Sequence, residues 1–132
     1  MNAFIIEHEN RPGSLASVAE AIAQRAINIT SVSGATVGST GSVAVLTNDE
    51  AGTRYALEAG GFAYREVGLV AAALEDKPGS LAAAARRLAD AGVNIETLLP
   101  TGMEGGKVRF AIGVSDTGAA QSALGELATV GV

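Results

Sequence analysis

The sequence contains no cysteine and only one histidine in 132 residues. Without cysteine the chain has no disulfide bond and no thiol nucleophile. A Cys-His pair is therefore impossible, and no group of His, Asp and Glu residues has the spacing of metal ligands. These absences argue against an enzyme, and we expect neither a metal nor another cofactor.

Long apolar runs and basic clusters are also missing. No apolar stretch approaches the roughly 18 residues that a membrane span needs, and the opening MNAFIIEHEN lacks the basic start and apolar stretch of a secretory signal. The net charge is -5 and the basic residues are scattered, which disfavours a nucleic-acid partner. We therefore expect a soluble, cytoplasmic protein with no membrane partner and no nucleic-acid partner.

The chain does contain an internal repeat. The segment ENRPGSL at residues 9–15 returns as EDKPGSL at residues 75–81. When residues 9–29 are laid over residues 75–95 without a gap, 10 of 21 positions are identical. A repeat at half the length of the chain predicts two copies of one structural unit. We expect residues 1–67 to form the first domain and residues 68–132 the second.

Each half predicts the same order of elements. Residues 3–7 and 69–74 are short, apolar and free of turn residues, which favours strands. Residues 15–22 and 81–88 carry apolar residues at helical spacing, including Leu15 and Leu81, so each helix is expected to bury one face. Two strands joined by a hairpin, a second helix and a fourth strand follow. The order β-α-β-β-α-β predicts an α+β fold with two ferredoxin-like units, each an antiparallel sheet with helices on one face.

Several polar residues and one glycine mark expected helix ends. Ser14 and Ser80 lie where the N-cap hydroxyl of the first helix of each half belongs. Asp49 and Asp116 are placed to cap the second helices, and Gly92 is placed to end the first helix of the second half. These signals predict helices that begin directly after each Pro-Gly pair.

The end of the sequence predicts an incomplete sheet. The last strand of the second half is due to begin at Thr129, three residues before the last residue. We expect this strand to be short or missing, which leaves an open sheet edge that favours pairing with another chain. A homodimer with sheets joined side by side is therefore expected.

The repeated Pro-Gly-Ser-Leu segment, which we call the elbow, has binding chemistry of its own. Pro12 fixes φ for the turn, and Gly13 lacks the side chain that would keep a ligand away. The amides of Ser14 and Leu15 lie at a helix N-terminus without an intrahelical acceptor, so they can hold a carboxylate. The helix dipole adds about 0.3–1 kcal/mol. The same residues also suit a tight strand-to-helix connection that binds nothing, so both interpretations remain open.

The motifs resemble a known family. A strand, the elbow, an amphipathic helix and an Asn-Ile strand start, found twice, resemble the ACT domain, a small-molecule-binding regulatory module of many enzymes of amino-acid metabolism. The segment HENRPG at residues 8–13 is similar to the serine-sensing ACT domain of D-3-phosphoglycerate dehydrogenase. The resemblance implies that His8, Asn10 and Asn28 contact an effector. No catalytic domain accompanies the two halves, so the chain resembles a stand-alone tandem ACT protein.

An α-amino acid also needs acceptors for its ammonium group. The carboxamide oxygens of Asn10 and Asn28, or the carboxylate of Asp76, can supply them. Asn28 is expected close to the elbow, because the second strand begins where the helix has returned. In the second half Leu74 replaces His8 and Asp76 replaces Asn10, so that site binds a different ligand or none. The candidate ligand-binding residues are His8, Asn10, Arg11, Pro12, Gly13, Ser14, Leu15, Asn28, Asp76, Pro78, Gly79, Ser80, Leu81 and Asn94.

Two functions follow from these residues. The first is a non-catalytic regulatory protein that binds an amino acid, with the ligand carboxylate held by the elbow. The alternative is a protein-interaction module, or a regulatory subunit of an enzyme of amino-acid metabolism, that has no ligand of its own. In both interpretations Arg86 and Arg87 are expected to form a solvated helix face.

Overall fold

The computed structural model describes residues 1–131 and divides the chain into two compact units. The N-terminal unit comprises Asn2–Glu66, and the C-terminal unit comprises Met1 and the residues from Val67 onward. Each unit has the element order β-α-β-β-α-β, which confirms the predicted α+β, ferredoxin-like fold class. Among the helices that the structure describes, none has the length and apolar character to cross a membrane.

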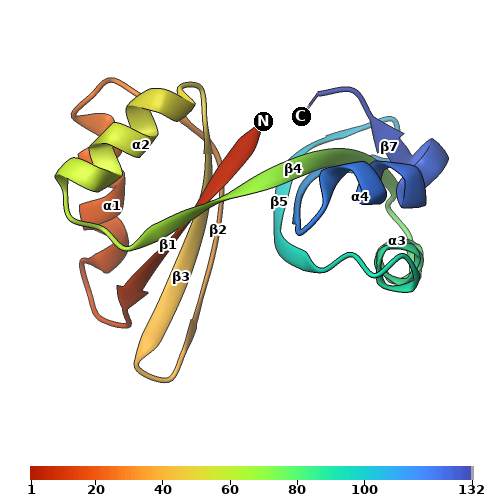
Figure 1. The fold of residues 1–132 in the computed structure, drawn as a ribbon, viewed down its shortest axis with the longest axis horizontal. Coiled ribbons are helices and arrows are strands. Elements are labelled where there is room, and N and C mark those ends of the chain that lie inside the picture. Colours follow the sequence, from red (N-terminus) through yellow and green to blue (C-terminus); the bar gives the residue numbers. More distant parts are fainter. Residues whose placement is uncertain (132) are drawn as a thin grey trace. The chain divides into compact units, whose positions relative to one another are not determined.

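In the N-terminal unit two helices cover one face of an antiparallel sheet (Figure 1). The strand order is β2-β3-β1, and the start of β4 lies beside β1, where the amide of Glu7 donates to the carbonyl of Ala63 at 3.0 Å. The elements are β1 (Asn2–Glu9), α1 (Ser14–Ala23), β2 (Ile29–Val37), β3 (Thr40–Thr47), α2 (Glu50–Ala59) and β4 (Tyr64–Glu75).

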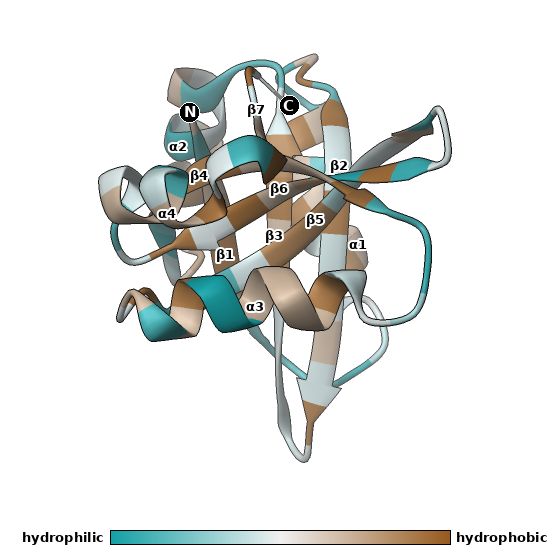
Figure 2. Cartoon of the chain, turned by 90° about the vertical axis from the view of Figure 1, so that its right-hand side faces the viewer, coloured by the Kyte–Doolittle hydropathy of each residue, from teal (hydrophilic) through white to brown (hydrophobic). Residues whose placement is uncertain are grey.

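The C-terminal unit repeats this plan, starting from the later residues of β4. Its strand order is β5-β6-β4-β7, and Figure 2 shows α3 and α4 over one face of the strands. The last strand has only two residues, which pair with Ala71 and Ala72 of β4. The elements are α3 (Ser80–Asp90), β5 (Ile95–Glu104), β6 (Lys107–Val114), α4 (Thr117–Leu124), the 3-10 helix η1 (Gly125–Leu127) and β7 (Ala128–Thr129).

Each unit has its own core, built by the two hydrophobic periodicities of the sequence. In the N-terminal unit Phe4 and Ile6 of β1 face the helices, because alternate strand residues share a face. They meet Val18 and Ile22, which lie one turn apart on α1. In the C-terminal unit the core combines β4, β6, α3 and α4. Its buried residues are Val70, Ala72, Leu74, Ala84, Leu88, Val93, Ile112, Val114, Ala120 and Leu124.

The first leucine of each apolar helix pattern lies outside the core. Leu15 is 54% exposed and Leu81 is 47% exposed, although each precedes the buried helix residues at helical spacing. The prediction that both side chains belong to the buried face is wrong. Each leucine lies in the first turn of its helix, at the elbow end, and the core begins one turn further along.

The elbow glycines begin the first helix of each unit. Gly13 and Gly79 occupy the N-cap positions with φ 90°, and neither helix has a side-chain cap. The prediction that Ser14 and Ser80 are N-caps is therefore wrong, because both already lie in the helix. The predicted caps of the second helices are confirmed, since Asp49 accepts from the amide of Gly52 and Asp116 accepts from the amide of Ala119.

The two units end their first helices differently. Gly92 has φ 72° just beyond α3, as predicted for a residue that ends a helix. The equivalent residue after α1 is Ala26, which adopts φ 57° and is the only non-glycine residue with positive φ among residues 1–131. A left-handed conformation disfavours any residue with a Cβ atom, so Ala26 carries backbone strain that Gly92 avoids.

Candidate functional site

The elbow of the N-terminal unit leaves two helix amides without a partner. The amide of Ser14 donates to the carbonyl of Arg11 at 3.3 Å, and the amide of Ser17 starts the helical pattern by donating to Gly13. Among the described residues, no acceptor is bonded to the amides of Leu15 and Ala16. The expected free amides are therefore present but shifted by one residue, because the helix begins at Ser14 itself.

These amides border a cavity of about 530 Å³, which we call the elbow cavity. It lies on the helix-bearing side of the sheet, between the first turn of α1 and strands β2 and β3. Such a volume is in the range typical of small-molecule sites. The lining residues are His8, Asn10, Arg11, Gly13, Ser14, Leu15, Ala16, Val32, Gly34, Ala35, Thr36, Ser42 and Val43.

The carboxamide of Asn10 is oriented by the hairpin between β2 and β3. Its Nδ2 donates to the carbonyl of Gly38 at 2.9 Å, and the backbone amide of Asn10 donates to the carbonyl of Ser39 at 3.0 Å. With Nδ2 engaged, Oδ1 remains as the acceptor of this side chain. Asn10 therefore presents a fixed acceptor at the rim of the elbow cavity, as a bound ammonium group requires.

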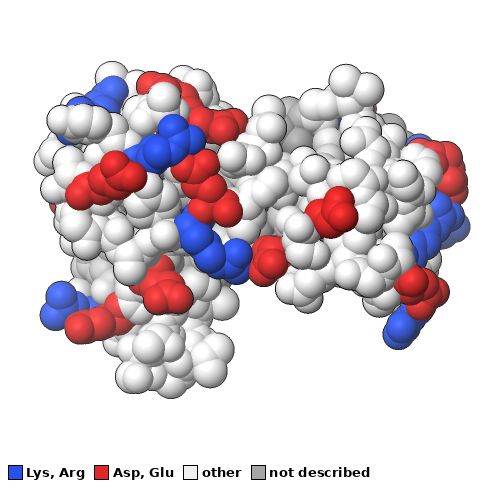
Figure 3. Space-filling view, in the orientation of Figure 1, with Lys and Arg blue, Asp and Glu red and all other residues white. Residues whose placement is uncertain are grey.

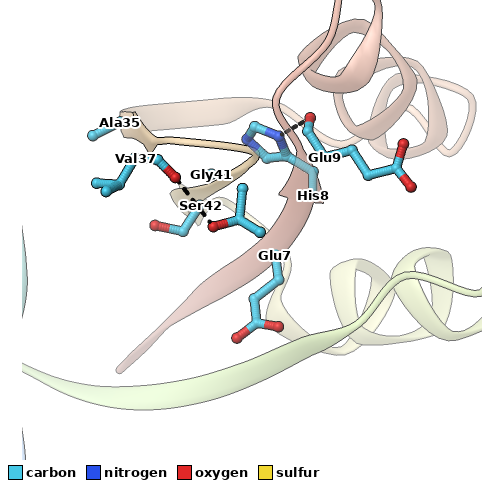
Figure 4. A pocket seen from close by; sticks show the side chains of 8 residues that line it. Glu7, His8, Glu9, Ala35, Val37, Gly41 and Ser42 are labelled. Atoms are coloured by element: carbon cyan, nitrogen blue, oxygen red, sulfur yellow. Dashed lines mark hydrogen bonds between the residues drawn. The ribbon is translucent and has the colours of Figure 1, made fainter.

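His8 extends the row of Phe4 and Ile6 beyond the core of the N-terminal unit. Its Nδ1 lies 2.9 Å from the carbonyl oxygen of Glu9 (Figure 4). Because a carbonyl oxygen only accepts, Nδ1 carries the hydrogen, and Nε2 of the neutral ring is an acceptor. The imidazole thus offers one hydrogen-bond acceptor to a ligand in the elbow cavity.

Gly41 makes room for the His8 ring. The two residues are paired across β1 and β3. A Cβ atom on Gly41 would lie 2.7 Å from Cε1 of His8 and 2.9 Å from Cγ2 of Thr36, closer than carbon atoms approach. This role of Gly41 cannot be seen in the sequence, because it depends on the strand register.

A second cavity of about 580 Å³ borders His8 and the β2-β3 hairpin (Figure 4). In the figure, Glu7 and His8 point to opposite sides of β1. The cavity contains two carboxylates and two hydroxyls but no basic side chain other than the imidazole. Its lining residues are Glu7, His8, Glu9, Ala35, Val37, Thr40, Gly41 and Ser42.

The remaining elbow residues differ in whether they line the elbow cavity. Arg11 lines the elbow cavity, and its Nε lies 3.4 Å from a carboxylate oxygen of Glu9, with both side chains exposed. The hydroxyl of Ser14 donates to the carbonyl of Glu9 at 2.7 Å, which closes the turn from β1 into α1. Pro12 does not line the cavity. Its contribution is the backbone of the turn.

Asn28 and Asn94 lie far from the elbows. The register places Ile29 opposite Thr47, whereas the elbow end of the sheet has His8 opposite Gly41. The backbone of Asn28 bonds instead to Asn48, and the backbone of Asn94 bonds to Ser115. The prediction that Asn28 lies beside the elbow is wrong, because α1 carries the chain to the opposite end of the sheet before β2 begins.

The sequence of the N-terminal unit matches a known family. Residues 3–59 match the model of the ACT domain. The match ends within α2, so the C-terminal unit lies outside it. No curated protein matches the sequence.

Solved structures match nearly the whole chain. A protein of Bacteroides thetaiotaomicron is 24% identical, with a TM-score of 0.74 over 93% of this chain and 85% of that one. The ligand-free regulatory subunit of aspartate kinase from Thermus thermophilus is 21% identical, with a TM-score of 0.63 over 96% of this chain and 91% of that one. The corresponding subunit from Thermus flavus is 20% identical, with a TM-score of 0.63 over 93% and 88%. These likenesses establish the fold.

The elbow of the C-terminal unit has the same backbone conformation as the elbow of the N-terminal unit. Gly79 has ψ -13° where Gly13 has -11°, and the amide of Ser80 donates to the carbonyl of Lys77 at 3.4 Å. The cavity beside this elbow is bordered by residues of β4, α3, β6, η1 and β7. Pro78, Gly79 and Ser80 line that cavity, whereas Asp76 and Leu81 do not.

Arg87 is partly exposed on α3, but it has partners that the sequence did not predict. Its Nη1 donates to the carbonyl of Leu124 at 2.9 Å, and its guanidinium binds both carboxylate oxygens of Glu126. Arg87 thus caps the C-terminus of α4. Its pairing holds the pKa of Glu126 down to about 2, aided by a hydrogen bond from the backbone amide of Glu126 itself.

Charged side chains elsewhere form local pairs. On the face drawn in Figure 3, basic and acidic side chains lie next to one another and form no basic stripe. In the N-terminal unit Arg54 binds Glu66, which lowers the pKa of that carboxyl, while Asn2 donates to the same carboxylate. Residues 1–131 contain no group of three or more acidic or histidine side chains able to hold a metal ion.

Proposed function

We propose that this protein is a non-catalytic regulator whose ACT domain binds a free amino acid in the elbow cavity. The observation that carries the proposal is the coincidence of three ligand groups at one cavity. The free amides of Leu15 and Ala16, the fixed carbonyl oxygen of the Asn10 side chain and the imidazole of His8 all border the same space.

Each group matches one part of an α-amino acid. The amides of Leu15 and Ala16 donate to the carboxylate, and the dipole of α1 adds about 0.3–1 kcal/mol. Oδ1 of Asn10 accepts from the ammonium group. Nε2 of His8 accepts from a polar ligand side chain, which favours an amino acid with a hydrogen-bond donor. Arg11 at the rim adds positive charge near the carboxylate.

We further propose that the C-terminal unit is a second ACT repeat and that the protein forms a homodimer. The same element order and the matching elbow backbone support the repeat. The two-residue β7 and the edge strand β2, with Val37 81% exposed, leave sheet edges that a second copy can extend. Analytical ultracentrifugation tests the homodimer. If the protein sediments as a 13.1 kDa monomer at all concentrations, the proposed dimer is contradicted.

An enzyme of amino-acid metabolism is the partner that we propose for this regulator. The support is that similar folds occur in proteins described as regulatory subunits of aspartate kinase. A change of packing on ligand binding would pass the signal to such an enzyme, provided that the ligand favours one of two states.

A docking module without a ligand is the second candidate, and one observation favours it. Leu15 and Val32 both line the elbow cavity and are 54% and 51% exposed. Two exposed apolar side chains around a groove are also what a partner protein would cover. The two candidates differ in whether a free amino acid stabilises the isolated protein.

Thermal unfolding with each of the twenty L-amino acids separates these candidates. A ligand at 100 times its dissociation constant stabilises the folded state by about 2.7 kcal/mol. We expect one or two polar amino acids to raise the melting temperature, and Asn10→Ala and His8→Ala to abolish that rise.

Asn28→Ala is the matched control. It removes a carboxamide of the same kind, outside the cavity, and keeps the backbone bond to Asn48. The control should retain the full response. A response to no amino acid, or one that survives Asn10→Ala unchanged, contradicts the proposed binding site and leaves the docking module.

A further inference from the structure

Gly34 lies in the middle of β2, where the backbone does not require a glycine. Its φ is not positive, whereas that of Gly102 in β5 is 155°. Strand β2 pairs with β3 without a register shift from Ser31 to Val37, so Gly34 does not belong to a bulge. An interior glycine weakens a strand, because it is flexible in the unfolded chain and has no side chain to pack.

Packing within the chain does not require this glycine either. A Cβ atom on Gly34 would lie 3.4 Å from the nearest atom, the carbonyl oxygen of Ser42, which is an ordinary contact. At the strand glycines Gly41, Gly68 and Gly113 a Cβ atom would instead lie 2.7–2.8 Å from a neighbouring side chain. Among the strand glycines of residues 1–131, Gly34 alone has neither a positive φ nor such an overlap.

The missing side chain leaves open space in the elbow cavity. Gly34 lies opposite Val43, which lies opposite the core residue Ile6 of β1. Residues directly opposite one another in neighbouring strands share a face of the sheet, so a side chain at position 34 would point to the helix-bearing side. There Gly34 lines the elbow cavity together with Val32 and Thr36 of the same strand.

The C-terminal unit has larger residues at the equivalent positions. In the register of the sheet Phe110 takes the place of Val43, and Pro100 lies opposite Phe110, where β2 has Gly34. Phe110 packs against the core of its unit. None of the described residues that line the cavity beside the second elbow belongs to β5. The cavity that extends to the outer strand is therefore the one with a glycine on that strand.

A regular strand with an unexplained interior glycine is typical of a place where a ligand or another backbone approaches closely. In the proposed function the amides of Leu15 and Ala16 bind the carboxylate, and Oδ1 of Asn10 binds the ammonium group. These groups lie at the elbow, and β2 forms the facing wall of the cavity. The part of an amino acid that remains to meet β2 is its side chain.

We propose that Gly34 is a specificity-determining residue of the elbow cavity, because it lets the side chain of the bound amino acid lie against the backbone of β2. This inference rests on the proposed function and adds a size limit to it. Atoms added at position 34 enter the space that the ligand side chain fills. They should therefore exclude amino acids in the order of the bulk of their side chains.

Titrations followed by ¹H–¹⁵N correlation spectra measure this limit, with each of the twenty amino acids as a probe. In the wild type the amides of Leu15, Ala16 and Gly34 should shift together with the amino acid that binds. Gly34→Ala should weaken the tightest-binding amino acid about tenfold, as one added methyl group does in a fitted pocket. Gly34→Val should abolish its binding, while any binding of glycine, which has no side chain, should change least.

Ser33→Val is the matched control. It adds a valine to the same strand on the opposite face, and Ser33 does not line the elbow cavity. The control should keep the dissociation constants of the wild type. Melting temperatures without ligand show whether the variants fold. Gly34→Ala should melt no lower than the wild type, because its Cβ has room and alanine restricts the unfolded chain.

Unchanged binding in Gly34→Val, or glycine as the tightest-binding amino acid of the wild type, would overturn the role of Gly34. So would a Gly34→Ala variant that loses its dimer together with its ligand in sedimentation, because the glycine would then serve the backbone of a second copy. A wild type that binds no amino acid contradicts the proposed function itself, and the size limit with it. A wild type that binds as tightly as Gly34→Val contradicts the size limit alone.

Discussion

The two elbows share one backbone conformation, but the side chains beside them differ. Their N-cap glycines differ by 2° in ψ at the same φ, and their first helix amides donate to equivalent carbonyls at 3.3 and 3.4 Å. In the N-terminal unit the residue before the turn is His8, half-buried at a cavity. In the C-terminal unit it is Leu74, which is buried in the core.

The difference shows that the elbow sequence determines a turn and does not determine a ligand. The side chain that fits before each elbow depends on residues that are distant in the sequence. Gly41 leaves space for an imidazole, whereas Val108 lies opposite Leu74 and packs beside an apolar side chain. The cavities differ accordingly, since the first lies towards β2 and the second towards the short β7.

The largest expected effect is a difference in stability between substitutions at Leu74 and at His8, which occupy equivalent positions in the two units. Leu74→Ala removes a side chain that is 3% exposed and should lower the free energy of unfolding by about 2–5 kcal/mol. His8→Ala should cost only about 1 kcal/mol, the net contribution of one hydrogen bond, while removing the amino-acid response. Urea denaturation measures both. Equal losses would mean that His8 is a core residue, against the proposed site.

The next prediction tests the space that Gly41 provides. Gly41→Ala should cost about 1–3 kcal/mol, because its Cβ would overlap the His8 ring. Adding His8→Ala should recover part of that loss. Gly34→Ala is the control on the neighbouring strand, where a Cβ meets atoms no closer than 3.4 Å. Strictly additive effects of the two changes, measured by urea denaturation, would exclude the contact.

A smaller effect is expected where the first helices end. Ala26→Gly should raise the free energy of unfolding by about 0.5–1 kcal/mol, because relief of the left-handed strain exceeds the added flexibility of the unfolded chain. Gly92→Ala should lower it by a similar amount. Thermal unfolding of both variants measures these two opposite changes in stability. Destabilisation by Ala26→Gly would show that its φ of 57° is not strained.

The smallest effect concerns pH and is confined to the C-terminal unit. The folded pKa of Glu126 is about 2, below its ordinary 4.5, so its pair with Arg87 stabilises the fold above pH 4.5 and is lost as the pH falls towards 2. Glu126→Gln should lower the melting temperature slightly at pH 7. The difference from the wild type should shrink between pH 4.5 and 2, and a constant difference would contradict this role.

Local features of the fold were predictable from the sequence. The half-length repeat predicted two units of the same order, and Asp49 and Asp116 predicted their helix starts from N-cap chemistry alone. The cap at the elbow was predicted one residue late, because a left-handed Gly13 can begin a helix without a side-chain bond.

Features that depend on register were not predictable. Asn28 was misplaced because spacing along the chain does not show at which end of the sheet a strand begins. The role of Gly41 depends on which residue of β1 lies opposite it. Arg87 has the local sequence of an exposed helix face, and only the approach of Leu124 and Glu126, 37 and 39 residues away, gives it partners.

Strand β4 belongs to both units. It begins at Tyr64 in one unit and ends at Glu75 in the other, without a linker. Cleavage between Glu66 and Val67 would therefore divide a single strand and leave unpaired backbone groups on both fragments. The two units are therefore joined through a shared strand, so excising either unit interrupts the backbone of β4.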